Sequence, residues 1–235
     1  LLRCLELARI PGAAVESNPR VGAVVVHGGR IIGEGSHEFH GGPHAEVNAI
    51  RGVKNPTLLP DSTLYVSLEP CNHHGKTPPC TQLILDSGIK NVVVGAVDPN
   101  PQMGGKSIDF LRSQGVNVVL AADECGFADL NRHFEVNQRE KRPYVVLKWA
   151  ESADGFVAGW DPNGKPEPRS ISCMEVNRHF HRLRHEIQAI AIGAQTAIVD
   201  NPSLTTRLWP GCNPVKILFD QNLIVPKTLQ IFQGE

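Results

Sequence analysis

The sequence predicts an α/β protein built from two consecutive domains. Segments with helical spacing of apolar residues alternate with β-branched runs along nearly the whole chain. Such alternation is typical of the α/β class, with at least part of the sheet parallel. A length of 235 residues suits one large or two modest domains. A charged run at 138–143 ends in proline and reads as a linker. We therefore predict domains at 1–141 and 142–235.

The first domain is predicted from apolar periodicity and from turn residues. In chain order it holds a helix at 1–10, strands at 21–27 and 30–35, a helix at 44–51, a strand at 63–68, a helix at 78–87, a strand at 91–97, a helix at 107–114, a strand at 116–120 and a helix at 124–138. Pro11-Gly12 ends the first helix. Gly28-Gly29 makes a hairpin of the first two strands. Prolines at 78 and 79 suit the start of a helix.

The second domain repeats the pattern. We predict an apolar strand at 144–149, a turn at 152–155, a polar proline-rich loop at 161–168, a helix at 173–185, and strands at 187–192 and 215–219. The helix carries a strongly basic face of arginines and histidines.

Three residues of the first domain, His44, Cys71 and Cys80, are of the types that bind zinc. Catalytic zinc sites keep three protein ligands and leave a fourth position for water, whose pKa the metal lowers. Glu46 is placed to shuttle protons between that water and a substrate. Residues two apart on a helix point about 200° away from each other. The histidine must therefore lie at or before the first turn of its helix.

Other interpretations of these residues stay open. A structural zinc site needs four ligands, and His73 or His74 could supply the fourth. Isolated histidines and cysteines are usually only packed. Four histidines without a motif are read as solvated or packed: His27, His37, His40 and His133. The Gly33-Glu34-Gly35 triplet is only a partial dinucleotide fingerprint and is discounted.

Composition narrows the class of partner. Net charge is −1 and the pI is near 6.9, without the basic excess of nucleic-acid-binding proteins. No apolar run reaches the length of a membrane span. Four cysteines lack a framework spacing and are expected to be free thiols in a reducing, cytoplasmic compartment: Cys4, Cys125, Cys173 and Cys212. These features favour a small-molecule substrate, and leave a homo-oligomer open. Residues before Leu1 are expected to be missing, because there is no starting methionine.

The sequence resembles the bifunctional deaminase/reductase family of riboflavin biosynthesis. The resemblance rests on 18–24, on 44–47, on 68–80 with its eight-residue spacing between cysteines, and on 98–101. It implies a cytidine-deaminase-like α/β/α sandwich with zinc on the three residues above and Glu46 as proton shuttle. The implied reaction is hydrolytic deamination of 2,5-diamino-6-(5-phosphoribosylamino)pyrimidin-4-one to 5-amino-6-(5-phosphoribosylamino)uracil. Asn18, His73, Lys76 and Thr77 are the expected substrate contacts, the last three for its phosphate.

The second half resembles the reductase of the same family, a dihydrofolate-reductase-like fold, through 148–155, 182–184, 193–196 and 200–207. The resemblance implies reduction of the ribose to a ribityl chain with NADPH. The implied cofactor contacts are Ala150, Ser170, Thr196 and Asp200, and the implied sugar-phosphate contacts are Arg184, Leu204 and Arg207. Taken alone, the two arginines read as surface charges.

Two features depart from the family pattern. Many members have Trp-Ile-Thr where this chain has Ser170-Ile171-Ser172. The family's reductase domain also continues beyond the position of Glu235, so the sequence is expected to be C-terminally incomplete and to deaminate without reducing. The alternatives are a deaminase of nucleosides or of tRNA adenosine, and a zinc-stabilised binding module without turnover. The eight-residue loop and the second domain favour the riboflavin deaminase/reductase interpretation over both alternatives.

Overall fold

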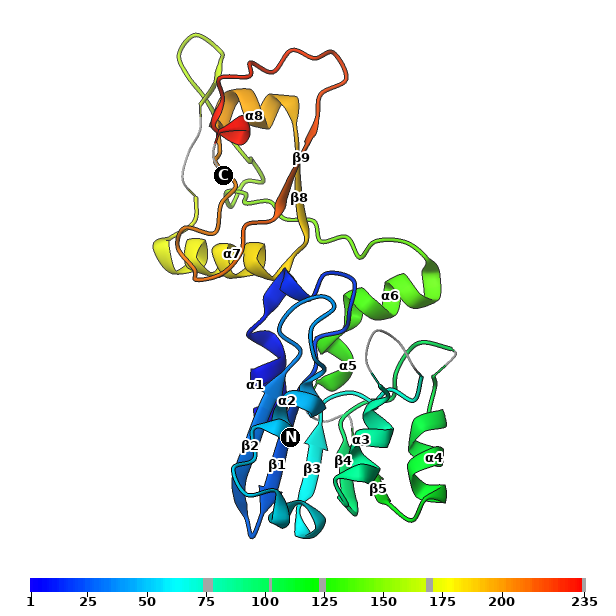
Figure 1. Cartoon of the computed structure of the whole chain (residues 1–235). Coiled ribbons are helices and arrows are strands. Elements are labelled where there is room, and N and C mark those ends of the chain that lie inside the picture. Colours follow the sequence, from blue (N-terminus) through cyan, green and yellow to red (C-terminus); the bar gives the residue numbers. More distant parts are fainter. Residues whose placement is uncertain (74–77, 102, 123–125, 168–170, 234–235) are drawn as a thin grey trace. The chain divides into compact units, whose positions relative to one another are not determined.

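The computed structural model describes residues 1–73, 78–101, 103–122, 126–167 and 171–233 (Figure 1). The chain forms two compact units, Leu1–Val145 and Val146–Glu235. Within the described residues, no helix combines the length and the apolar character that a membrane span requires.

The first unit is built on one five-stranded sheet in the order β2-β1-β3-β4-β5. Its strands are β1 (Gly22–His27), β2 (Arg30–Ser36), β3 (Thr63–Val66), β4 (Asn91–Val94) and β5 (Asn117–Leu120). The first strand pairs antiparallel with both of its neighbours, and β3, β4 and β5 are parallel. The predicted α/β class with a partly parallel sheet is therefore confirmed.

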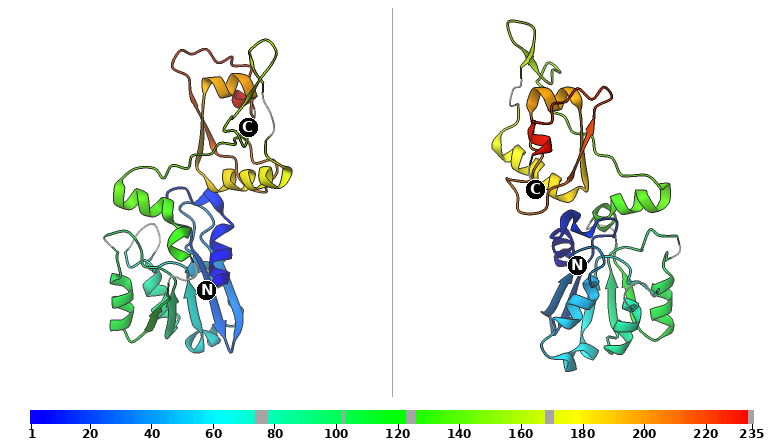
Figure 2. Two further views of the ribbon diagram at one scale, coloured as in Figure 1. Left: turned by 180° about the vertical axis from the view of Figure 1, so that it is seen from behind. Right: turned by 45° about the horizontal axis from the view of Figure 1, so that its top comes forward.

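Helices cover both faces of this sheet. They are α1 (Leu2–Arg9), α2 (Ala45–Arg51), α3 (Cys80–Asp86), α4 (Lys106–Ser113), α5 (Phe127–Leu130) and α6 (Arg132–Glu140), with short 3₁₀ segments at Gly12–Val15 and Pro56–Asp61. Alternate residues of β1 enter opposite cores, because side chains of a strand point to alternate faces. Ala23 and Val25 join the core under α2, α3 and α4, while Val24 packs with Leu7 of α1. Figure 1 is seen from the α2 face and the left view of Figure 2 from the α1 face.

Two glycines of β2 let α2 lie directly against the sheet. A Cβ at Gly33 would come 2.3 Å from the carbonyl oxygen of Ala49, and one at Gly35 would come 2.5 Å from that of Ala45. Both distances are far below contact, so any side chain would push the helix away. The glycine pair thus serves packing, and the helix it admits begins beside His44.

The helix predicted at 124–138 is broken into α5 and α6 at Asn131, where φ is −113°. The break has a physical reason. The buried Asn131 amide accepts a hydrogen bond from the backbone N–H of Arg20 at 2.8 Å and donates one to its carbonyl at 2.9 Å. A buried backbone segment needs such partners, and these fix the segment that carries Asn18. Residues 123–125 lie outside the described residues.

The half-buried His133 gives the first unit a predictable pH dependence. Burial, and then the charge of Arg20, lowers the pKa of His133 to about 4, whereas an unfolded histidine titrates near about 6.5. Between these values the unfolded chain binds a proton that the folded chain does not. We therefore expect the free energy of unfolding to fall by up to about 3 kcal/mol as pH drops from 6.5 to 4. Urea denaturation across this range should show it, and His133→Gln should flatten the slope. Equal slopes in both proteins would contradict the assignment.

The second unit is smaller and contains two short sheets. Its elements are β6 (Gly159–Trp160), β7 (Pro166–Glu167), α7 (Met174–Glu186), β8 (Ala189–Gly193), α8 (Ala194–Asp200), β9 (Val215–Phe219) and a 3₁₀ segment at Gln230–Phe232. β6 pairs antiparallel with β7, and β8 pairs parallel with β9. The helix predicted at 173–185 and the two strands after it are present, while α8 was not predicted.

The strand predicted at 144–149 is wrong. This segment has no regular secondary structure, and Val145, Leu147 and Trp149 are 62%, 78% and 63% exposed. A strand is stabilised by hydrogen bonds to a neighbouring strand, and none of the strands in the described parts of the chain pairs with this segment. The loop predicted at 161–168 is also partly wrong, since it holds β7.

Candidate functional site

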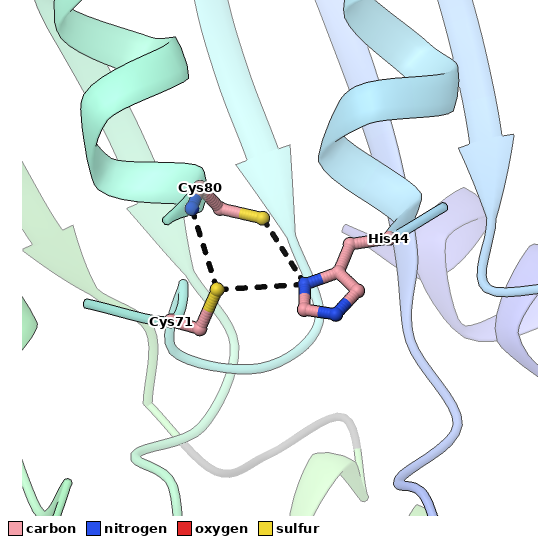
Figure 3. Close-up of side chains that lie close together, drawn as sticks. All are labelled: His44, Cys71 and Cys80. Atoms are coloured by element: carbon pink, nitrogen blue, oxygen red, sulfur yellow. Dashed lines mark hydrogen bonds between the residues drawn. The ribbon is translucent and has the colours of Figure 1, made fainter. Parts of the chain in front are cut away.

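Three side chains from different elements meet at one end of the sheet of the first unit (Figure 3). Nδ1 of His44 lies 3.2 Å from Sγ of Cys80 and 3.5 Å from Sγ of Cys71. The backbone N–H of Cys80 also lies 3.3 Å from Sγ of Cys71. All three ligand atoms are within 4.8 Å of one another, close enough to hold a single metal ion.

Local structure explains how each ligand reaches the site. His44 is the N-cap of α2, with extended backbone at φ −71° and ψ 160°, so it precedes the first turn as predicted. Cys80 is the first residue of α3, directly after Pro79 at the N-cap. Cys71 follows the C-terminal end of β3.

The donor set fits zinc. Two thiols and an imidazole are ligands that zinc prefers, and in a tetrahedral site their donor atoms lie about 3.5 Å apart. A hydrogen bond from Cys80, followed by one from His44, lowers the pKa of Cys71. The hydrogen bond to Cys71 and burial raise the pKa of Cys80. One sulfur is thus a ready thiolate. A bound cation would favour loss of the second proton as well.

Glu46 lies in the first turn of α2 and is 3% exposed. Burial raises its pKa to about 7, and the negative charge of Cys71 adds to the effect. The charges of Cys71 and His44 both affect the pKa of Glu46, so this carboxyl group lies within electrostatic range of the metal-ligand candidates. A carboxyl group that titrates near neutral pH can both accept and return a proton.

A buried histidine, His37, packs against the metal-ligand candidate His44. The sequence did not predict this contact. His37 is 4% exposed, and its ring meets that of His44 edge-on, with centroids 5.7 Å apart. Its Nδ1 donates to the carbonyl of Pro43, so Nε2 is free to accept from the amide of Asn18, each at 3.0 Å. The predicted substrate contact Asn18 is therefore one residue removed from a metal ligand. No motif marks His37, and only its burial reveals it.

The predicted phosphate loop is described only in part. His73 is exposed. Burial raises the pKa of Asp98, and the charge of His73 opposes that rise, so these two side chains are near each other. Lys76 and Thr77 lie outside the described residues.

In the second unit the structure brings the two predicted arginines together. Burial, and then repulsion from Arg207, lowers the pKa of Arg184. Arg184 donates to the carbonyl of Thr205 at 2.9 Å, and Arg207 donates to Ser203 Oγ at 3.1 Å. Leu204, between these hydroxyl-bearing residues, is buried and has a positive φ of 57°. Two cations among hydroxyl groups form a site suited to a phosphate.

The predicted cofactor contacts are less closely grouped. Thr196 lies in the first turn of α8 and Asp200 is its last residue, and both are exposed. Ala150 is half-buried in the irregular segment before β6. Ser170 lies outside the described residues.

Two buried histidines of α7 hold the loop that carries Arg207, whereas the sequence indicates only that they belong to a basic helix face. The backbone N–H of Leu208 donates to Nδ1 of His181 at 3.4 Å, and that of Cys212 donates to Nδ1 of His185 at 3.3 Å. The four-residue spacing within the helix is their only sequence signal, because it puts both side chains on one face.

Each half of the chain matches a known protein family. Residues 3–96 match the cytidine and deoxycytidylate deaminase zinc-binding region. Residues 143–235 match the RibD C-terminal domain.

Whole-chain relatives combine both halves. The riboflavin biosynthesis protein RibD of Aquifex aeolicus is 42% identical over 98% of this chain and 64% of its own length. RibD of Escherichia coli strain K12 is 35% identical over 96% of this chain and 64% of its own length.

A solved structure also matches both halves of the chain. The diaminohydroxyphosphoribosylaminopyrimidine deaminase/5-amino-6-(5-phosphoribosylamino)uracil reductase of Thermotoga maritima has a TM-score of 0.87 at 41% identity, over 99% of this chain and 65% of that one. The chain thus spans just under two thirds of these relatives. It carries the domain pair of the RibD deaminase/reductase family, a cytidine-deaminase-like zinc-binding domain followed by a RibD-type reductase domain.

Proposed function

We propose that residues 1–141 form a zinc-dependent deaminase domain that converts 2,5-diamino-6-(5-phosphoribosylamino)pyrimidin-4-one to 5-amino-6-(5-phosphoribosylamino)uracil. The observation that carries the proposal is the convergence of His44, Cys71 and Cys80 beside the buried Glu46. The family matches and the whole-chain relatives support it.

In this proposal His44, Cys71 and Cys80 hold one zinc ion, which when bound lowers the pKa of water and so supplies a nucleophile near neutral pH. Glu46 takes the proton of the water that attacks the ring carbon bearing the amino group. It delivers that proton to the ring nitrogen, then takes the second proton from the new hydroxyl group on the same carbon and delivers it to the departing amine. The carbon–nitrogen bond breaks, a carbonyl forms and ammonia leaves. Burial of Glu46 keeps bulk water from competing for that proton.

The substrate is a small phosphorylated molecule. Asn18 orients the pyrimidine in this proposal, and its hydrogen bond to His37 supports the role. His73, Lys76 and Thr77 bind its phosphate, because a cation with hydroxyl and ring N–H donors suits that group. This assignment and the near-neutral net charge argue for a soluble cytoplasmic metabolite over a nucleic acid.

We propose that residues 142–235 belong to an NADPH-dependent reductase domain that reduces the ribose of the deaminated product. Arg184, Leu204 and Arg207 hold the sugar phosphate, supported by the proximity of the two arginines. Ala150, Ser170, Thr196 and Asp200 contact the cofactor. The match to the RibD C-terminal domain favours this role.

One comparison of substrates tests the deaminase proposal. Ammonia release is measured with the phosphoribosylaminopyrimidine, with its dephosphorylated form, with cytidine and with an adenosine-containing tRNA anticodon stem. We expect turnover of the phosphorylated pyrimidine and a KM at least about tenfold higher without the phosphate. Preferred turnover of cytidine or tRNA would identify a different deaminase. Zinc binding without ammonia from any substrate would indicate a binding module.

A further inference from the structure

Glu69 is a buried carboxylate to which the proposed deamination assigns no role. It is 4% exposed and lies two residues before Cys71. The backbone N–H groups of Asp98 and Gly105 donate to its Oε2 at 3.1 and 2.8 Å. The backbone N–H of Ser107 donates to Oε1 at 3.0 Å, and the Ser107 hydroxyl makes a short hydrogen bond to the same oxygen. Both oxygens are therefore occupied by donors from one stretch of chain.

Those donors make the buried charge tolerable. A carboxylate removed from water is costly unless it is hydrogen-bonded, and hydrogen bonds to a charged acceptor are about twice as strong as neutral ones. Ser107 lies in the first turn of α4, where the helix dipole also favours a negative charge. Glu69 therefore joins the end of β3, the segment after β4 and the start of α4.

The segment that Glu69 holds lies beside the metal centre. The backbone N–H of Glu69 donates to the carbonyl of Ala96 at 2.8 Å, which aligns the two strand ends. Beyond it, Oδ1 of Asp98 accepts from the N–H of Asn100 at 2.8 Å and closes a tight turn. Glu69 lies two residues before Cys71, so its hydrogen bond from the N–H of Asp98 brings this turn next to the segment that carries a metal ligand.

We propose that Glu69 is a positioning residue that fixes Asp98, Gly105 and Ser107 next to the segment of Cys71 and so sets one wall of the substrate site. Its carboxylate does not act on the metal or on the reacting atoms. It accepts hydrogen bonds from three backbone amides. These bonds fix the position of the turn at Asp98 relative to Cys71. The catalytic part of this inference rests on the proposed deamination.

Glu69→Gln tests the inference, because the amide keeps the shape of the side chain but presents only one acceptor oxygen. Two of the four donors then face an NH₂ group. We expect amide hydrogen exchange to accelerate by at least about tenfold at the amides that lose their acceptor, either those of Asp98 and Gly105 or that of Ser107, and KM for the phosphorylated pyrimidine to rise by a similar factor. Zinc content should stay equal to wild type, and kcat should change by less than about threefold.

Two further variants serve as controls. Ser107→Ala removes only the hydroxyl donor and should leave exchange at Asp98 and Gly105 unchanged. Glu69→Asp keeps the charge on a shorter side chain, and it should loosen the same three amides even if the glutamine variant fails to fold. Unaltered exchange at these amides would overturn the inference, as would loss of zinc with the segment still protected. Hydrogen exchange is read without turnover, so absence of ammonia release from wild type would count against the proposed function alone.

Discussion

Glu46→Gln is expected to keep the zinc ion and to lose turnover by about 10³-fold or more. The substitution keeps the size of the side chain, so α2 and the N-cap residue His44 should stay in place. It removes the group that, in the proposed mechanism, accepts a proton from water and returns it to the substrate. General acid–base catalysis of this kind contributes about 10²- to 10⁴-fold to rate, and here one residue serves in both directions.

The measurement combines metal analysis with ammonia release on the same preparation. The exposed Glu175→Gln makes the same chemical change in the second unit and should match wild type in zinc content and ammonia release. If Glu46→Gln lost zinc together with activity, the carboxylate would be a metal ligand. If it retained more than about a tenth of wild-type kcat, proton transfer would have to be assigned to another group.

Cys80→Ser is expected to abolish zinc retention and turnover together. Among the described residues, Cys80 is one of the two cysteines in the proposed zinc cluster, and it starts α3 directly beside Cys71. A hydroxyl group is a much poorer zinc ligand than a thiolate, and two remaining ligands hold the metal weakly. Purified Cys80→Ser should contain less than about a tenth of an equivalent of zinc. The thermal transition of the first unit should also fall, because metal binding adds to folding stability.

Cys212→Ser is the matched control, because this thiol is exposed in the second unit. It should retain zinc and release ammonia at the wild-type rate. Full zinc content in Cys80→Ser would show that the metal is bound elsewhere in the chain.

Local patterns predicted much of the first unit. The spacing of His44 and Glu46 required the helix to start at the histidine, and the structure places His44 at the N-cap. Valine-rich runs predicted the buried strands, since alternate faces of those strands pack under helices. The three ligand types predicted one cluster, and the structure brings their donor atoms together.

Contacts between distant parts of the chain could not be predicted in this way. Asn131 breaks a helix to bind Arg20, which is 111 residues away. His37 and Glu69 each act through residues that no local pattern connects to them. The apolar run at 144–149 was wrongly predicted for the same reason. Its composition favours a strand, but none of the strands in the described residues pairs with it.

Zinc titration of the metal-free chain tests the central claim most directly. The protein is stripped with a chelator, zinc is added in fractions of an equivalent, and ammonia release from the phosphorylated diaminopyrimidine is followed at each step. Ammonia release should be absent without metal, rise in proportion to zinc and level off at one equivalent per chain. Full turnover by the stripped protein, or one tightly bound equivalent of zinc without any turnover, would contradict the assignment of His44, Cys71, Cys80 and Glu46 as a catalytic zinc centre.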